Sequence, residues 1–422
     1  MDLLRKIWEF LFRNVMWLYI IMGLFSWVGI YPMTFQLLMF VSFLFSVTLV
    51  PKYRMSNVLD FFVVIFIIYI FISSIVFDYP DHLYLWQNDL FFTILPMSFY
   101  FIAKTTNYQL ESFVEKMAMP MAIVMVIGII LYIQNPAWYS AIKYAQLLDS
   151  YSYTEASVPE IMLREAFRLS SIWKTSYVIG YANGTFILYL LFQLIFGEMT
   201  KKKRRYYYFL FVLSFVVLIL AGFKSMMLAF VVSVFASIFL IKDRRKKKHL
   251  FWVSIFITVL AVVFITADSG YSEFFVQRFK DATSEEGLAY RLEHTGHGVE
   301  FDSFFGAGFA HYSMAAKSLG KWFIQDSEYQ KILAELGILG FSIFVMLLLS
   351  ALAISLKRKA LFEMCIIITY MISFIGSSSI SAETTFPFFF WFAVGSVSRT
   401  FRKVQSIGTN KSLINKTQIA IV

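Results

Sequence analysis

Charged residues are scarce in this sequence of 422 residues, where Asp, Glu, Lys and Arg make up 15% of the chain. Soluble domains contain about 25% of these residues. Hydrophobic residues make up 59%, and the mean hydropathy is +0.69. This much apolar surface needs lipid around it rather than one water-excluded core. The composition therefore excludes an ordinary soluble globular protein and predicts an all-α, polytopic membrane protein.

Cysteine and histidine are also rare. The single cysteine, Cys365, excludes an internal disulfide, and its place in an apolar run predicts a small buried hydrophobic residue. Three of the five histidines, His294, His297 and His311, lie in one segment. Their spacing is not that of a standard zinc site. We therefore expect neither a metal nor another cofactor.

Apolar stretches of about 20 residues predict transmembrane helices. We predict about twelve, near residues 14–30, 33–50, 58–77, 89–103, 118–134, 177–197, 206–222, 224–241, 250–267, 332–355, 360–377 and 385–398. Residues 1–422 then form a single integral membrane domain. The interiors of these spans are predicted to be nearly free of charge.

The distribution of charge predicts the orientation. With twelve spans, 26 of the 37 Lys and Arg residues fall on one side, whereas 19 of the 27 Asp and Glu residues fall on the other. Basic loops remain in the cytoplasm. Both termini are therefore predicted to be cytoplasmic. The basic runs lie beside the spans, where they determine the orientation of the protein and contact anionic lipids. The net charge of +10 therefore does not predict a nucleic-acid partner.

Two outer segments are too long to be simple hairpins: a first large outer loop over 135–176 and a second over 268–331. Loops of this length inside a compact domain usually have a function. The candidate functional residues lie in these loops and at one tight outer hairpin.

Three cations on the outer side are candidate ligands: Arg168, Lys224 and Arg291. If they converge, they suit a diphosphate, since arginine binds phosphate oxygens in bidentate fashion and lysine adds a point charge. Two interpretations without a binding role also remain open for these residues. Lys224 can extend to the outer headgroups, and both arginines can be solvated loop residues.

The second loop contains further polar candidates. Gly306-Ala307-Gly308 is too short for a nucleotide fingerprint, so we predict a tight turn or a close backbone approach. Asp326, Glu328 and Tyr329 directly precede the span predicted from 332. Asp326 then either caps that helix or accepts a proton from a hydroxyl group. His311 serves either loop polarity or a substrate hydrogen bond.

Motifs in these segments resemble, in order, those of the bacterial O-antigen polymerase (Wzy) and O-antigen ligase superfamily. The matching stretches are RLSSIWKTSYVIG after Arg168, GFKS around Lys224, Arg291, GAG at 306–308, and DSEYQKILAELGILG from Asp326 to Gly340. The last stretch is the most specific. The resemblance covers most of the chain in topology but only a small part in motif.

Two positions depart from the family pattern. The ligases begin the final motif with a histidine, which is taken as the catalytic residue, where this chain has Asp326. This favours polymerase over ligase, and Glu328 or His311 remain alternatives for the catalytic base. Lys224 stands where the family commonly has arginine, which keeps the charge but loses the fork geometry.

The resemblance implies a metal-independent membrane glycosyltransferase. It would join oligosaccharide repeat units, carried on undecaprenyl diphosphate, into O-antigen, capsule or exopolysaccharide on the outer face of the bacterial plasma (inner) membrane. Arg168, Lys224 and Arg291 would hold the diphosphate, and Asp326, Arg168 and Arg291 would be catalytic. His311, Glu328 and Tyr329 would bind substrate. A flippase and chain-length regulators are the protein partners that such a polymerase implies.

An O-antigen ligase and a transporter or flippase are the alternatives. The ligase differs mainly in its acceptor. A transporter predicts charged or broken elements at membrane depth. The small number of charges predicted within the spans argues against it.

Overall fold

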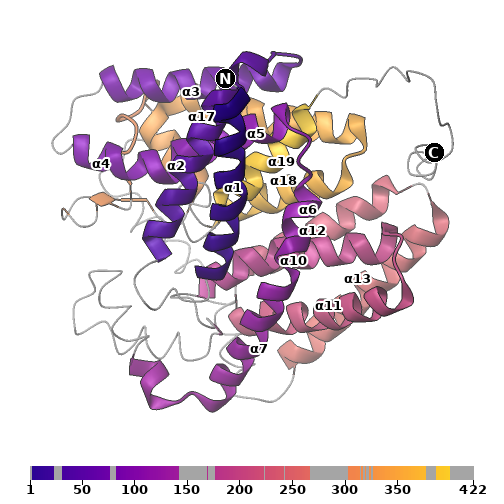
Figure 1. Ribbon diagram of the computed structural model, residues 1–422. Coiled ribbons are helices and arrows are strands. Elements are labelled where there is room, and N and C mark those ends of the chain that lie inside the picture. The colour runs from indigo at the N-terminus through magenta and orange to yellow at the C-terminus, as the bar shows by residue number, and fades with distance from the viewer. Residues whose placement is uncertain are drawn as a thin grey trace, which may run out of the picture.

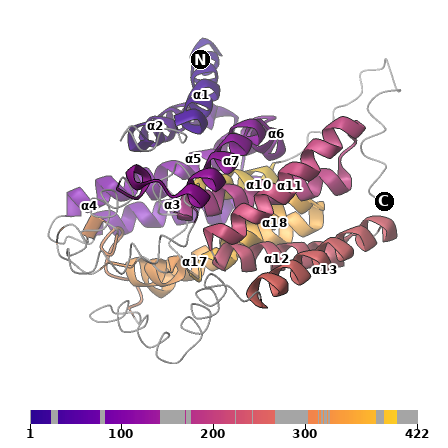
Figure 2. The same ribbon diagram turned by 90° about the horizontal axis from the view of Figure 1, so that it is seen from below.

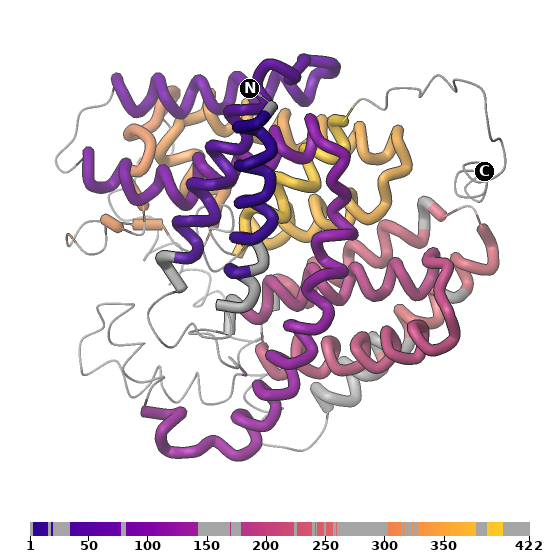
Figure 3. Tube along the Cα trace, viewed as in Figure 1, coloured from indigo at the N-terminus to yellow at the C-terminus, as the bar shows by residue number. Residues whose placement is uncertain are grey.

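The computed structural model describes residues 2–22, 31–76, 82–141, 169, 176–222, 224–241, 243–266, 303–313, 315–316, 319, 323–324, 327–376 and 386–399 (Figures 1 and 3). Helices are the regular secondary structure of this part of the chain, so the all-α prediction is confirmed for it.

Each predicted span contains helical residues in its described part. The N-terminal half contains α1 (Asp2–Met22), α2 (Tyr31–Leu49), α3 (Val58–Val76), α4 (His82–Asp89), α5 (Ser98–Thr105), α6 (Leu110–Lys116) and α7 (Ala118–Gln134), with a short 3-10 turn over Val50–Lys52. The C-terminal half contains α10 (Ser176–Phe196), α11 (Lys201–Ala221), α12 (Lys224–Leu240), α13 (Arg244–Thr266), α17 (Glu328–Arg358), α18 (Leu361–Ser373) and α19 (Pro387–Ser398).

The last two helices form the centre of the bundle. α18 packs against α12, α17, α10 and α19, while α19 packs against α5 (Figure 1). Figure 2 shows α1 and α2 at one edge of the molecule, with α12 and α13 on the far side. The sequence of α19, PFFFWFAVGSVS, is apolar almost all round, and nearly every residue of it is buried. A helix without a polar face belongs inside a protein or a bilayer, and here the protein itself covers it.

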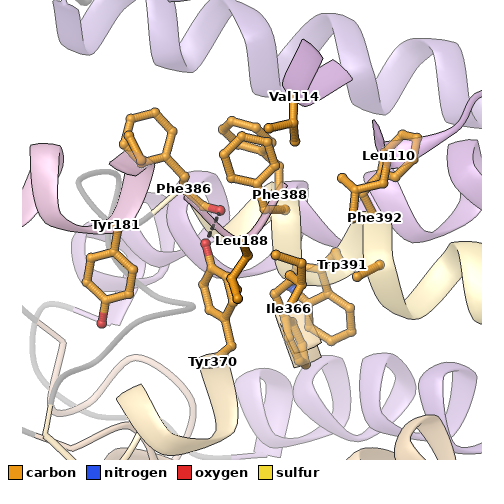
Figure 4. Close-up of a cluster of buried hydrophobic side chains, with 14 of the residues drawn as sticks. Leu110, Val114, Tyr181, Leu188, Ile366, Tyr370, Phe386, Phe388, Trp391 and Phe392 are labelled. Atoms are coloured by element: carbon orange, nitrogen blue, oxygen red, sulfur yellow. Dashed lines mark hydrogen bonds between the residues drawn. The ribbon is translucent and has the colours of Figure 1, made fainter. Parts of the chain in front are cut away.

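Aromatic side chains fill this centre (Figure 4). Trp391 and Tyr370 are fully buried, and Tyr370 lies against Tyr181 of α10 with ring centroids 5.9 Å apart. The Tyr370 hydroxyl donates a hydrogen bond to the carbonyl of Phe386 over 2.7 Å. This satisfies the polar end of a buried phenol and ties α18 to the start of α19.

Within the described residues, five helices are long and apolar enough to cross a membrane: α2, α3, α10, α11 and α17. The pair α6 and α7, bent by 46°, would make a sixth. The chain is thus a multi-pass membrane protein. With 13 and 12 residues, α18 and α19 are shorter than the ~20 residues that a full crossing needs. The count of twelve spans therefore stays a prediction.

Two predicted spans differ from the structure in an informative way. Residues 89–103 are not one continuous helix, because a π turn (Leu90–Ile94) and a 3-10 turn containing Pro96 (Leu95–Met97) separate α4 from α5. Proline has no N–H for the helical ladder. The span predicted from 332 begins at Glu328 and runs 31 residues to Arg358.

Polar contacts gather the loops that were predicted to be cytoplasmic at one end of the bundle. Asn57 donates to the Ser398 carbonyl over 3.1 Å, and Lys203 pairs with Glu115 at 2.7 Å. The guanidinium of Arg399 donates to the carbonyl of Ala103. These contacts join the ends of five helices, α3, α5, α6, α11 and α19, as the predicted topology requires of loops on one side.

A buried ion pair also lies at this end, between Asp60 of α3 and Lys104 of α5. Asp60 is fully buried and also accepts hydrogen bonds from Tyr100 and Ser398. The pair therefore links α3, α5 and α19. Asp60 lies in the first turn of α3 and Lys104 in the last turn of α5, so the charges stand at helix ends, and their pairing and hydrogen bonds let them tolerate burial.

Removing one member of this pair should destabilise the bundle. We expect Lys104→Met to lower the stability by about 3–5 kcal/mol, because it leaves the Asp60 carboxylate buried without a cation. The midpoint of thermal unfolding in detergent measures the effect. Lys203→Met is the matched control, since the pair that it breaks is nearly half exposed and contributes about 0–1 kcal/mol. Equal midpoints for the two variants would contradict the assignment.

Candidate functional site

The first turn of α17 lies where the most specific motif begins. Ser327 is its N-cap, with the hydroxyl accepting a hydrogen bond from the Gln330 N–H over 3.3 Å. The same hydroxyl and the Glu328 N–H both donate to the carbonyl of Phe374, at 3.0 Å each. The capping role considered for Asp326 therefore belongs to Ser327, and the helix start is fixed to the end of α18.

Nine residues into α17 the helix breaks. Gly337 has φ 66° and ψ −172°, which is not helical. The chain segment 303–308 lies alongside and pairs with 334–339. Four backbone hydrogen bonds join them: Ala307 N–H to Ala334 O (2.9 Å), Gly308 N–H to Glu335 O (2.9 Å), Ile338 N–H to Ser303 O (3.1 Å) and Leu339 N–H to Phe304 O (3.1 Å). The polar groups released by the break are thereby satisfied, as a membrane interior demands.

The two segments approach so closely that side chains are excluded at the contact. A Cβ on Gly306 would lie 2.4 Å from the Glu335 carbonyl oxygen, and one on Gly337 would lie 2.4 Å from the Gly306 nitrogen. Both glycines have positive φ. The prediction of a close backbone approach at Gly306-Ala307-Gly308 is confirmed, and its partner is the break in α17.

Helix α3 supports this junction from the other side. The Tyr69 hydroxyl donates to the Leu336 carbonyl over 3.0 Å, which satisfies another acceptor at the break. Four residues further on, the Ser73 hydroxyl accepts from the Phe309 N–H over 3.1 Å. One face of α3 thus holds both the broken helix and the loop segment.

Buried charges adjoin the junction, and the sequence analysis did not single them out. Lys331 of α17 forms an ion pair with Asp89 of α4, with Nζ 2.6 Å from Oδ2, and both side chains are almost fully buried. Glu335, one turn further along α17, accepts the Tyr312 N–H at Oε1 over 3.0 Å. Asp89 and Lys331 lie at the edges of the predicted spans 89–103 and 332–355, and Glu335 lies within the second. Buried charges beside broken helices are the kind of feature that was expected of a transporter.

Three predicted substrate-binding residues, Glu328, Tyr329 and His311, lie in the described part of the chain. Glu328 is buried in the first turn of α17. The Tyr329 hydroxyl donates to the Met371 carbonyl over 3.0 Å, and its ring packs on Phe374. His311 is half-buried in the loop, with its ring 4.7 Å from that of Tyr312. Tyr329 therefore has a packing role whatever else it does.

The other candidates are only partly visible. Arg168, Arg291 and Asp326 lie outside the described residues, and of Lys224 only the backbone is described, as the first residue of α12. Leu169 is described: its N–H donates to the carbonyl of Leu220 over 2.9 Å. The residue that follows Arg168 is thus anchored at the end of α11, four positions before Lys224.

The described residues offer no group of three or more His, Cys, Asp or Glu side chains arranged around a metal position. Cys365 is buried, as predicted, with its sulfur 2.9 Å from the Ser237 hydroxyl.

Comparison with known families adds one finding. Residues 209–345 match the O-antigen ligase family. The matched segment is about a third of the chain, and it runs from α11 through the break in α17. It contains Lys224, Arg291, the junction and the start of the final motif. The match confirms the resemblance to the O-antigen ligase and polymerase superfamily. No curated protein matches the chain.

A methyl group at Gly337 should disrupt the junction. For Gly337→Ala we expect a loss of about 1–3 kcal/mol or more from the positive φ, with a further cost from the clash with 304–306. Thermal unfolding in detergent measures the loss. Gly184→Ala is the matched control, because its Cβ would meet the flexible end of Met226 rather than backbone. Equal stability of the two variants would contradict the close approach.

Proposed function

We propose that this protein polymerises lipid-linked oligosaccharide repeat units on the outer face of the bacterial plasma membrane. The match of residues 209–345 to the O-antigen ligase family carries the proposal. The paired segments 303–308 and 334–339 support it, since both belong to motifs that the superfamily resemblance contains. The substrate would be a repeat unit on undecaprenyl diphosphate, and the product O-antigen, capsule or exopolysaccharide.

The proposal includes the orientation. About twelve spans with both termini in the cytoplasm would place α17's first turn, the α11–α12 hairpin and the two large loops at the outer surface. Flipped lipid-linked sugars are available there, and a flippase and chain-length regulators would act beside the enzyme. The grouping of Asn57, Glu115, Lys203 and Arg399 at the opposite end of the bundle supports this arrangement.

Arg168, Lys224 and Arg291 would bind the diphosphate of the growing chain. The glycosidic carbon loses its bond to the diphosphate oxygen as the acceptor hydroxyl attacks. Cations stabilise the negative charge that develops on the leaving group. The anchoring of Leu169 beside the α11–α12 hairpin supports a shared site for Arg168 and Lys224. No metal ion is needed for this step.

Asp326 would orient the acceptor hydroxyl and take its proton as the new glycosidic bond forms. Ile324, two positions earlier, is fixed by its N–H to the Tyr312 carbonyl over 3.0 Å, and Ser327 caps α17. Asp326 stands between these two residues in the sequence. His311 and Glu328 are the alternative bases, and with Tyr329 they would contribute to substrate binding.

Ligation is the second candidate function, and the description of the matching family favours it. A ligase would use the same diphosphate site and differ in its acceptor. Transport is weaker, although the broken helices and the buried Lys331–Asp89 pair are features of transporters. The family match is what favours transfer over transport.

Loss of the outer arginines tests the proposal. In a host that makes the cognate polymer, we expect Arg168→Ala and Arg291→Ala each to reduce long polymer about 100-fold, with single repeat units accumulating on the lipid. Gel profiles of the extracted glycan measure both quantities. Arg164→Ala and Arg278→Ala are matched controls, because each removes an arginine from the same loop.

Three other outcomes are informative. Normal chain length in both arginine variants would overturn the proposal. Full-length polymer left on the lipid would instead indicate a ligase. Repeat units that accumulate on the cytoplasmic face would indicate a flippase.

A further inference from the structure

Two broken helices meet at the Lys331–Asp89 pair. Asp89 is the last residue of α4, directly before the π turn, and Lys331 lies in the first turns of α17, before its break. The side chains of both are at most 5% exposed. A buried charge is costly without a partner, so this pair fixes the position of α17 against α4.

Lys331 also acts along its own helix. Glu335 lies four residues further on, is 2% exposed, and interacts electrostatically with the Lys331 ammonium. Residues at this spacing face each other on a helix. The positive Lys331 side chain thus lies between two negative side chains, Asp89 and Glu335. Glu335 is the member of this group that contacts the loop.

Glu335 then holds the loop through Tyr312. Its Oε1 accepts the Tyr312 N–H over 3.0 Å, and the carbonyl of Tyr312 accepts the Ile324 N–H, also over 3.0 Å. Tyr312, Ile324 and Ala334 form a small buried cluster of their own. Tyr312 therefore connects the three charged residues to the loop: its N–H binds Glu335 and its carbonyl binds Ile324.

The turn before Tyr312 needs such an anchor. Ala310 has φ 69°, an unfavourable value for a residue with a side chain. The His311 N–H donates to the Gly308 carbonyl over 3.3 Å. A turn of this kind persists where its surroundings over-determine it, and the Glu335 carboxylate supplies part of that constraint.

We propose that Glu335, held by Lys331 and Asp89, is a positioning residue for the transfer reaction. It fixes the turn that carries His311, because its carboxylate accepts the Tyr312 N–H directly after that residue. This inference rests on the proposed function for its catalytic consequence. The positional part stands on the contacts alone, so the two can be tested separately.

A labelling experiment tests the positional part. Because Cys365 is the single cysteine, a Cys365→Ser background accepts one reporter, His311→Cys, whose reaction with a maleimide can be followed on the purified protein in detergent. We expect Glu335→Leu to raise the labelling rate about tenfold or more, since the Tyr312 N–H loses its acceptor. Glu335→Gln should restore the slow rate, because its amide oxygen can accept the same hydrogen bond.

Membrane-based transfer assays test the catalytic part, with native His311 and Cys365. At equal amounts of folded protein, we expect Glu335→Leu to lower kcat about 100-fold, because small misplacements of reacting groups have effects of this size. Glu335→Gln should recover most of the lost kcat. The matched control is the double variant Asp60→Asn with Lys104→Met. It removes a buried ion pair at the other end of the bundle and should leave kcat unchanged.

The outcomes separate the two claims. Unchanged labelling in Glu335→Leu, or equally fast labelling in Glu335→Gln, would overturn the positioning role. If Glu335→Leu does not fold, Glu335→Gln decides the question. Fast labelling of the Glu335→Gln variant would overturn the positioning role. So would a loss of kcat in Glu335→Gln as large as the loss in a His311→Ala variant. A wild-type protein without transfer activity would overturn the proposed function and leave the labelling result to decide the position of the turn.

Discussion

The break in α17 at Gly337 sets a constraint on everything around it. A break in a helix frees carbonyl and N–H groups, and buried backbone groups of this kind need other partners. Here the segment 303–308 and the hydroxyl of Tyr69 supply the missing partners. The loop must therefore enter the bundle between α3 and α17. Because the backbones meet at Gly306 and Gly337, no side chain can replace either hydrogen at the contact without moving the segments apart.

The same end of the molecule concentrates the buried charge. Isolated charges inside a bilayer are costly, but Asp89 and Lys331 neutralise each other, and Glu335 obtains a backbone N–H. The pair of Asp60 and Lys104 does the same at the other end. The small number of charges within the spans was an argument against a transporter, and the buried Asp89, Lys331 and Glu335 weaken it. The broken helices are compatible with transport as well as with transfer, so the family match has to decide between them.

Much of the fold could be predicted from the sequence, because long apolar runs in a membrane protein leave few alternatives to a helix. Residues 118–134 and 224–241 illustrate this, since α7 and α12 begin at the predicted residues. The start of α17 was misplaced by four residues. Considered alone, the charged residues Glu328 and Lys331 suggest a solvated loop. A charged side chain tolerates burial when it has a partner, and the partner of Lys331, Asp89, is far away in the sequence. Long-range pairing of this kind leaves no local signal.

Two signals in the sequence nevertheless indicated the missing features. Ser327 and Gln330 have the spacing of a capping box, which predicts a helix starting at 328 rather than 332. Gly337 interrupts a run of good helix formers, ILAELGILG, where a glycine usually needs a reason. The close approach at 306–308 was predicted, but its partner could not be identified without the structure. The candidate site itself was less predictable, since Arg168, Arg291 and Asp326 were proposed from resemblance, whereas Glu335 and Tyr312 emerge from contacts.

The junction also separates structural from chemical roles within the motifs. Gly-x-Gly at 306–308 and the glycine at 337 are distant in sequence but form one unit, in which each makes room for the other's backbone. Their glycines have no functional group, so any chemistry has to come from side chains that the unit holds in place. The turn after Gly308 carries His311, and the chain beyond Tyr312 leads through Ile324 to Asp326. For the proposed transfer reaction a fixed backbone junction is an advantage, because positioning of the reacting groups lowers the barrier.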